Sequence, residues 1–190
     1  MSESEYIFIF YSFILALAVG EIARGVGNML RLRRVKYSLL HLAWVGLITL
    51  SILEFWWGAW FLQSFEGWSI YGLLVGFLST FILYLAAFLS FPLTLEEDVK
   101  LENYYFRESS RLWSLYALLL SNNLLANRVF GVAEWVSIYP KDVLLLVLIS
   151  LCVLAARSKR TVVHWSVLTL FYITGAAFVL VAQPFLGGKH

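Results

Sequence analysis

The sequence predicts an all-α fold: a polytopic membrane protein whose six transmembrane helices form three hairpins, with both termini outside. Three observations predict it. The 190-residue chain is 61% hydrophobic and 14% charged, its mean hydropathy is +0.81, and long apolar runs alternate with short charged connections. A soluble domain of this size could not bury so much apolar surface, so the bilayer acts as the solvent.

Six apolar runs of spanning or near-spanning length follow one another along the chain. A spanning helix needs about 20 residues, and the fifth run is shorter than that. The runs are residues 6–30, 38–63, 69–91, 111–131, 142–156 and 161–184. Because the connections are short, residues 1–190 form one transmembrane domain with no room for a separate soluble domain.

The first run is expected to be a retained span. The chain starts with acidic residues, has no basic region before the run, and has no small-residue cleavage site after it, unlike a signal peptide. Glu21 and Arg24 share a helix face three residues apart, and Asn28 extends the polar stripe. Beside it runs a stripe of small residues that permits close helix approach. Its members are Ala16, Gly20, Ala23 and Gly27. We therefore expect the first helix to pack at the centre of the bundle, with its polar edge turned inward. Glu21 and Arg24 are expected to form an internally satisfied ion pair that fixes this packing.

The second run contains Glu54 as its only formal charge. A carboxylate near the centre of a membrane helix costs roughly 2.5–3.5 kcal/mol, so it needs a partner or a role. Glu54 lies roughly 24 Å above the inner end of its span, and Arg128 of the fourth run lies roughly 25 Å above Arg111. The matching depths predict an intramembrane Glu54–Arg128 ion pair. The alternative is that Arg128 snorkels to the outer surface and Glu54 is protonated.

The third run ends at Pro92 and is followed by the longest connection, residues 92–110. This segment is polar and mixed in charge, with Glu96, Glu97 and Asp98 among its basic residues. We expect it to extend the fourth helix as a solvated end into the cytoplasm or to lie on the membrane surface.

The fourth run adds Asn122, Asn123 and Asn127. If the first, second and fourth helices are neighbours, the polar residues of the spans form a ladder across most of the bilayer. Its members in order of depth are Asn28, Arg24, Glu21, Asn122, Asn123, Asn127, Glu54 and Arg128. Such a ladder could carry protons or a polar solute. It could equally be interhelical hydrogen bonding at about 0.6 kcal/mol per bond.

The fifth run holds the only cysteine, Cys152, so a disulfide within one chain is excluded. His164 at the start of the sixth run and His41 at the start of the second lie just inside the cytoplasmic boundary. Two histidines on different helices could ligate a haem, which is a remote alternative because nothing else supports it. An interfacial histidine beside a basic connection needs no ligand.

The distribution of Lys and Arg predicts on which side of the membrane each connection lies. Ten lie in three alternate connections and only Lys141 and Lys189 lie on the other side. The ten are Arg31, Arg33, Arg34, Lys36, Lys100, Arg107, Arg111, Arg157, Lys159 and Arg160. This strong asymmetry predicts that the basic connections face the cytoplasm.

The function hypotheses follow from the polar spans. The first is a small transporter or channel for a proton, an ion or a small polar solute. The second is a non-transporting scaffold or interaction protein whose polar residues serve packing and oligomerisation. The third is a haem or lipid enzyme. No H-E-x-x-H, G-x-S-x-G or glycine-rich phosphate loop occurs, so enzyme activity is unsupported. We expect no catalytic residue, cofactor, metal site or nucleic-acid partner; the expected partners are the bilayer and, in a homo-oligomer, further copies.

The N-terminal half resembles a widespread group of small, uncharacterised bacterial membrane proteins with six spans. The residues that carry the resemblance are Glu5, Tyr6, Phe10, Tyr11, Ser12, 15–18, the basic turn 31–36, 41–44, 55–57, Pro92 and 104–107. The resemblance implies a multi-pass protein of the bacterial cytoplasmic membrane. It transfers no catalytic residue, because the group has no established activity.

Overall fold

The described residues form six helices, as the sequence predicts. The computed structural model describes residues 3–32, 35–60, 67–93, 99–131, 137 and 139–182. The helices are α1 (Glu3–Arg31), α2 (Leu39–Trp60), α3 (Ile70–Leu89), α4 (Leu101–Val129), α5 (Pro140–Arg157) and α6 (Thr161–Ala182). Four of these, α1, α2, α3 and α6, are long and apolar enough to cross a membrane.

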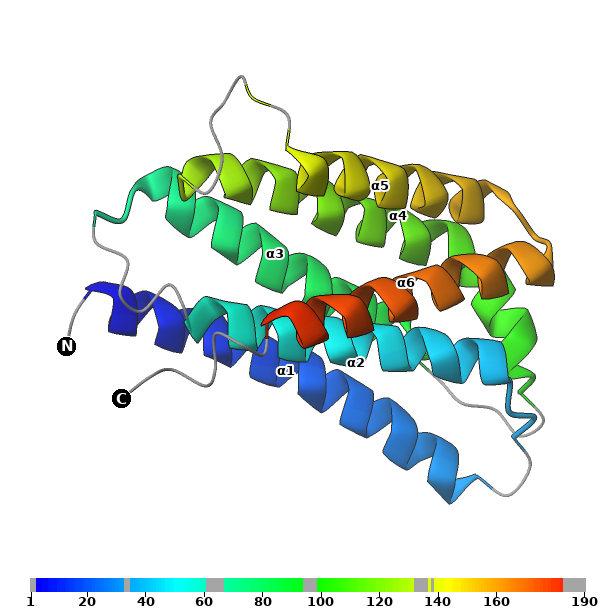
Figure 1. Ribbon diagram of the computed structural model, residues 1–190. Coiled ribbons are helices and arrows are strands. Elements are labelled where there is room, and N and C mark those ends of the chain that lie inside the picture. The colour runs from blue at the N-terminus through cyan, green and yellow to red at the C-terminus, as the bar shows by residue number, and fades with distance from the viewer. Residues whose placement is uncertain are drawn as a thin grey trace.

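The helices run alternately in opposite directions and form two layers (Figure 1). One layer places α1, α3, α4 and α5 side by side in that order, and the other is made of α2 and α6. Helix α2 lies against α1, α3 and α4, whereas α6 lies against α2 and α5. Helix α3 therefore separates α1 from α4 among the described residues.

Helix α1 is peripheral, and the expectation that it packs at the centre is wrong. It contacts only α2 and α3 within the described residues. Its buried residues in the span are Ile7, Tyr11, Leu15, Ala18, Gly25 and Met29. The ring of Phe91 lies so close to Gly25 that a side chain there would meet it. The close approach thus uses Gly25, and the predicted small-residue stripe faces away from the bundle.

Helix α4 begins ten residues before the fourth apolar run, so the expected extension is confirmed. The extension is solvated on one face only: Glu102, Asn103 and Arg107 are exposed. On its other face Leu101, Tyr105 and Ser109 are fully buried. A short backbone bridge pins this start: Lys36 N donates to Val99 O, and Leu101 N donates to Lys36 O, both at 3.1 Å. The extension therefore packs beneath the starts of α2 and α6.

Helix α5 has 18 residues, three more than the predicted 142–156. Pro140 at its first turn has no N–H to leave unsatisfied, which suits that position. The Asp142 carboxylate accepts the Tyr139 N–H at 3.0 Å and so caps the helix start.

The three basic connections meet at one end of the bundle. The 32–38 and 90–100 connections are joined by the Lys36–Lys100 bridge. The third connection is tied to α4 by Lys159, whose ammonium donates to Phe106 O and, at 3.0 Å, to Ser109 Oγ. We call this the basic end. Six further residues assigned to the connections and the C-terminus lie outside the described residues: Arg33, Arg34, Glu96, Glu97, Asp98 and Lys189.

Aromatic rings fill the core between α2, α4 and α6. Trp44 of α2 packs edge-on against Trp113 of α4, with ring centroids 5.0 Å apart. Tyr116 of α4 packs edge-on against Phe171 of α6 at 5.1 Å. Such edge-to-face pairs add about 0.5–1.5 kcal/mol to area burial. Trp44 and Trp113 are completely buried, so this part of the interior is filled by side chains.

Candidate functional site

Arg128 pairs with Asp142 and not with Glu54, so the predicted Glu54–Arg128 ion pair is wrong. Its guanidinium donates to Asp142 Oδ1 at 3.3 Å and to Oδ2 at 2.8 Å. It also donates to Ser137 O at 3.0 Å. The pair is nearly buried, with side chains 13% and 4% exposed.

The predicted Glu54–Arg128 pair rested on matching depth alone. Depth along a helix says how high a residue lies but not which neighbour its helix faces. Helix α4 packs along α5, and Asp142 in the first turn of α5 is at the same end of the bundle as Arg128. An Arg near the end of one helix and an Asp in the first turn of the next are the sequence signal of this pair.

Glu54 lies at the contact between α2 and α6. Its Oε1 is 3.2 Å from where a Cβ on Gly175 of α6 would lie, so the carboxyl group reaches that helix. One turn before it, Ser51 Oγ and Tyr116 OH share a hydrogen bond of 2.7 Å that joins α2 to α4. Among the residues that the structure describes, Glu54 itself has no hydrogen-bond or ion-pair partner.

Glu21 and Arg24 pair with each other, as expected from their spacing. Arg24 Nε donates to Glu21 Oε2 at 3.0 Å, and Nη2 donates to the same oxygen. The Glu21 side chain is 21% exposed and the Arg24 side chain is 40% exposed, so this pair lies at the bundle surface. The expectation that the polar edge of this helix turns inward is wrong.

The asparagines of α4 have different surroundings. Asn122 is buried, and its amide donates to Val75 O at 2.8 Å and to Ser79 Oγ at 2.7 Å, which ties α4 to α3. Asn123 and Asn127 are half-buried.

These positions do not form one continuous ladder. Asn28, Arg24 and Glu21 lie on α1, which does not contact α4 in the described structure. Asn122 is directed to α3, and Arg128 is directed to α5. The polar residues therefore join neighbouring helices at separate places instead of lining one path, because α3 stands where the ladder needed contact between α1 and α4.

His164 belongs to a hydrogen-bonded cluster at the basic end. Its Nε2 faces the carbonyl oxygen of Ser158 at 3.0 Å. A carbonyl can only accept, so Nε2 carries the proton and Nδ1 is the acceptor. Nδ1 then accepts from Tyr105 OH at 2.8 Å and from Trp113 Nε1 at 3.1 Å. Burial raises the pKa of Tyr105, which keeps this hydroxyl able to donate.

His41 belongs to a second cluster beside the first. Its Nε2 donates to Ser90 O at 2.7 Å, and Trp44 Nε1 donates to Ser90 Oγ at 3.0 Å. Trp44 also packs against Tyr105, which connects the two clusters. The His41 Nδ1 atom is buried and has no hydrogen-bond partner within the described part of the chain.

Three of the four imidazole nitrogens of the two histidines are already hydrogen-bonded, which leaves His41 Nδ1 as the one without a partner among the described residues. Each histidine directs its Nε2 to a backbone carbonyl, and both Nδ1 neighbours of His164 are donors. Ligation through these atoms requires breaking the bonds that hold the basic end together. The sequence indicated both histidines but not their partners Ser90, Tyr105 and Trp113. The aromatic run 104–106 beside the second basic connection is a signal for Tyr105.

A groove opens beside the clusters, between the end of α3 and the start of α4. Its volume is about 570 Å³. Phe88, Leu89, Leu93, Lys100, Arg107 and Arg111 are among its lining residues. We call it the α3–α4 groove. It is apolar on the α3 side and basic on the α4 side.

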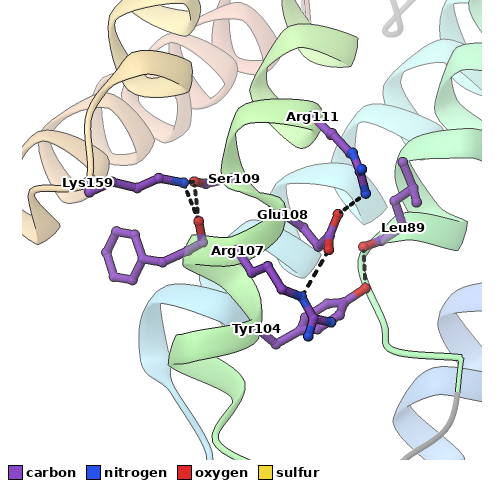
Figure 2. A network of polar contacts seen from close by, with 8 residues as sticks. Leu89, Tyr104, Arg107, Glu108, Ser109, Arg111 and Lys159 are labelled. Atoms are coloured by element: carbon purple, nitrogen blue, oxygen red, sulfur yellow. Dashed lines mark hydrogen bonds and ion pairs between the residues drawn. The ribbon is translucent and has the colours of Figure 1, made fainter.

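Figure 2 shows the polar contacts that shape the basic side of the groove. Glu108 accepts from Arg107 at 3.1 Å and from Arg111 at 2.9 Å. Glu108 is buried, whereas the two arginines are about 70% exposed, at 69% and 73%. Tyr104 OH donates to Leu89 O at 2.9 Å and so links the start of α4 to the end of α3. Burial raises the pKa of Tyr104 to about 12. The carboxylate thus holds both guanidinium groups toward the groove.

No protein-family model matches this chain, and no curated protein or solved structure matches it significantly.

Proposed function

We propose that all six helices cross the bacterial cytoplasmic membrane, with both termini outside and the basic end in the cytoplasm. The alternation of helix direction and the gathering of the basic connections at one end support this topology. Helix α5, with 18 residues, is about 27 Å long, close to the roughly 30 Å thickness of the hydrocarbon core.

Within this topology, we propose that the protein is a non-transporting membrane scaffold or interaction protein. The observation that carries the proposal is that buried polar side chains join adjacent helices in pairs. Asn122 joins α4 to α3, Arg128 joins α4 to α5, and Tyr105 joins α4 to α6. Aromatic rings fill the core between these contacts. The arrangement suits a stable bundle that presents its surfaces to other molecules.

The α3–α4 groove is the surface proposed to contact anionic lipid headgroups on the cytoplasmic side. Lys100, Arg107 and Arg111 provide three cations against the single carboxylate of Glu108 among its described lining residues. Guanidinium groups bind phosphate oxygens bidentately. The apolar wall from α3 suits an acyl chain, so an anionic phospholipid fits both sides of the groove.

The test is reconstitution of the purified full chain into proteoliposomes. We expect no protein-dependent flux of protons, monovalent ions or small polar solutes across vesicles that carry a pH-sensitive or ion-sensitive dye. A flux that scales with protein content, and that protein-free vesicles lack, would contradict the scaffold proposal.

Transport is the second candidate, and the position of Glu54 favours it. This carboxyl group lies within the apolar second span and has no partner among the described residues, at a helix contact containing Gly175. A carboxyl group in that setting suits proton transfer. If transport occurs, Glu54→Gln abolishes a flux that the wild-type protein shows, while Glu21→Gln on the peripheral helix leaves it intact.

A further inference from the structure

A row of stacked aromatic rings leads away from the α3–α4 groove along α3. Phe88 lines the groove. The rings of Tyr84, Phe81 and Phe77 follow it at spacings of three or four residues, which place them on one helix face. From Phe88 upward, consecutive ring centroids are 6.3, 6.4 and 5.7 Å apart, with interplanar angles of 28°, 29° and 12°. Phe10 of α1 stacks on Phe77 at 6.0 Å and continues the row. We call these five rings the aromatic stripe.

The α3 part of the aromatic stripe is about as long as one leaflet is thick. Phe77 and Phe88 are eleven residues apart, which is roughly 16 Å along the helix. One leaflet contributes about 15 Å, half of the roughly 30 Å hydrocarbon core. Phe10 and Phe81 are exposed and the other three rings are half-buried, so the stripe is open to lipid. An acyl chain that starts at the groove therefore reaches the middle of the bilayer where the stripe passes to α1.

The basic side of the groove holds two guanidinium groups ready for one anion. The buried Glu108 carboxylate accepts from Arg107 Nε with Oε1 and from Arg111 Nη1 with Oε2, so it fixes both groups one helical turn apart (Figure 2). Both Nη groups of Arg107, together with Nε and Nη2 of Arg111, have no hydrogen-bond partner among the described residues. Lys100, just before the start of α4, lines the same groove.

We propose that the groove and the aromatic stripe together bind one lipid of the cytoplasmic leaflet whose headgroup is a phosphate monoester, a diacylglycerol phosphate. The phosphate lies between Arg107 and Arg111, and one acyl chain lies along the stripe. A phosphate monoester has three unesterified oxygens, one for each of the three cations of the groove, whereas a phosphate diester has two. It also carries about −1.5 to −2 charges at pH 7, against the single charge of a diester. This inference rests on the proposed contact with anionic lipid and names the headgroup and the path of the chain.

Continuity between the charged and the apolar surfaces selects a lipid over a soluble phosphate compound. Phe88 belongs both to the lining of the groove and to the aromatic stripe, so the two surfaces meet at one residue. The groove volume of about 570 Å³ lies within the range of sites that hold small ligands. A soluble phosphate compound would contact the basic side and leave the stripe uncovered. A diacylglycerol phosphate matches both surfaces in the order in which they meet along the bilayer.

Native mass spectrometry of the purified full chain tests the headgroup. We expect phosphatidic acid to bind at least about five-fold more tightly than phosphatidylglycerol with the same acyl chains. Arg107→Lys combined with Arg111→Lys keeps both charges but loses the bidentate donors, so this variant should bind the two lipids equally. Arg157→Lys combined with Arg160→Lys is the matched control and should keep the preference. Equal binding by the wild-type chain, or a preference that persists in the first double variant, would overturn the headgroup assignment.

Glycerol 3-phosphate distinguishes a lipid from a soluble phosphate compound. It carries the same phosphate monoester without acyl chains, so it cannot contact the aromatic stripe. We expect about a hundred-fold molar excess of glycerol 3-phosphate to leave phosphatidic acid bound, because the apolar contacts of the chain are missing. Displacement of the lipid at equal concentration would overturn the choice of a lipid.

Photo-cross-linking in liposomes tests the path of the chain. Phosphatidic acid with a photoreactive diazirine in one acyl chain is expected to label residues 77–88 at least about five-fold more than exposed Phe178 and Leu180 of α6. Phe81→Leu combined with Tyr84→Leu should remove this excess. Phe13→Leu combined with Phe178→Leu removes two exposed rings elsewhere and should retain it. Similar labelling of the two helices in the wild-type chain would overturn the role of the stripe.

The outcomes separate this inference from the function on which it rests. Equal binding of phosphatidic acid and phosphatidylglycerol in the groove would overturn only the headgroup, and the contact with anionic lipid would stand. Anionic lipid that stays bound after Arg107→Ala combined with Arg111→Ala would overturn the contact itself. A flux in the proteoliposome assay would contradict the scaffold function without changing either lipid measurement.

Discussion

At the scale of single residues, burial determines what each polar group does. Arg128 and Asp142 are almost entirely enclosed, and each satisfies the other. Arg107 and Arg111 bind one buried carboxylate but remain mostly in solvent. The first arrangement holds two helices together, whereas exposed ion pairs contribute little to stability.

The Arg128–Asp142 pair gives the first prediction. Arg128→Leu leaves the Asp142 carboxylate enclosed and unpaired, so we expect a clear fall in the melting temperature in detergent. Arg128→Leu combined with Asp142→Leu recovers part of the loss, because neither charge is then left alone. Arg111→Leu is the control and is expected to change the melting temperature less. Strictly additive losses would show that the two residues are not coupled.

The His164 cluster gives the second prediction. Tyr105→Phe removes a hydroxyl that donates to His164 Nδ1 and accepts from Trp113 Nε1. Leaving buried polar atoms without this partner costs about 1–3 kcal/mol, so we expect a loss of stability of that size in denaturant titrations. Tyr71→Phe is the matched control, because Tyr71 is mostly exposed. A similar loss in both variants would mean that the hydroxyl bonds of Tyr105 contribute nothing specific.

At the scale of elements, helix contacts depend on where small residues stand. The predicted stripe on α1 faces outward, while Gly25 on the other side receives the ring of Phe91. On α3, Gly76 lies under the Tyr11 hydroxyl, which donates to Leu73 O at 2.9 Å. A glycine at such a place permits contact distances that any larger residue prevents.

Gly25 gives the third prediction. Gly25→Ala brings a methyl group into the ring of Phe91, and overpacking of this kind costs about 1–3 kcal/mol. We expect a lower melting temperature in detergent. Gly58→Ala has open space around it and should be neutral or slightly stabilising, since alanine favours a helix. Equal effects at the two glycines would contradict the close α1–Phe91 contact.

The α3–α4 groove gives the fourth prediction. Arg107→Ala combined with Arg111→Ala removes both guanidinium groups from the groove, so we expect less anionic phospholipid to remain bound through purification, measured by native mass spectrometry. Arg157→Ala combined with Arg160→Ala removes the same charge from another connection at the basic end and should retain the lipid. Equal loss in the two double variants would indicate a general charge effect instead of binding in the groove.

At the scale of the whole molecule, the alternating helices bring all three basic connections together. Chain segments far apart in sequence then share bonds: Lys36 with Val99 and Leu101, and Lys159 with Phe106 and Ser109. The basic end is consequently held together by bonds between segments far apart in sequence. The proposed topology places this end in the cytoplasm.

Topology gives the fifth prediction. In intact cells, Lys141→Cys at the start of α5 is expected to react with a membrane-impermeant maleimide. Leu93→Cys, an exposed position at the basic end, is expected to react only after the cells are lysed. The unsubstituted chain reports the background from buried Cys152. The reverse pattern of labelling would place the basic end outside.

The helical elements of this chain could be predicted from local sequence. The lengths and hydropathy of the apolar runs predicted the six helices, because helix formation in an apolar run is a local property. The i to i+3 spacing of Glu21 and Arg24 likewise predicted their bond. Which helices are neighbours is seen only in the folded bundle. Helix α3 lies between α1 and α4, so the polar ladder is broken, and α5 supplies Asp142 to Arg128 in place of Glu54. Neighbours depend on which helix faces fit together, and periodicity along one helix carries no information about the face of another.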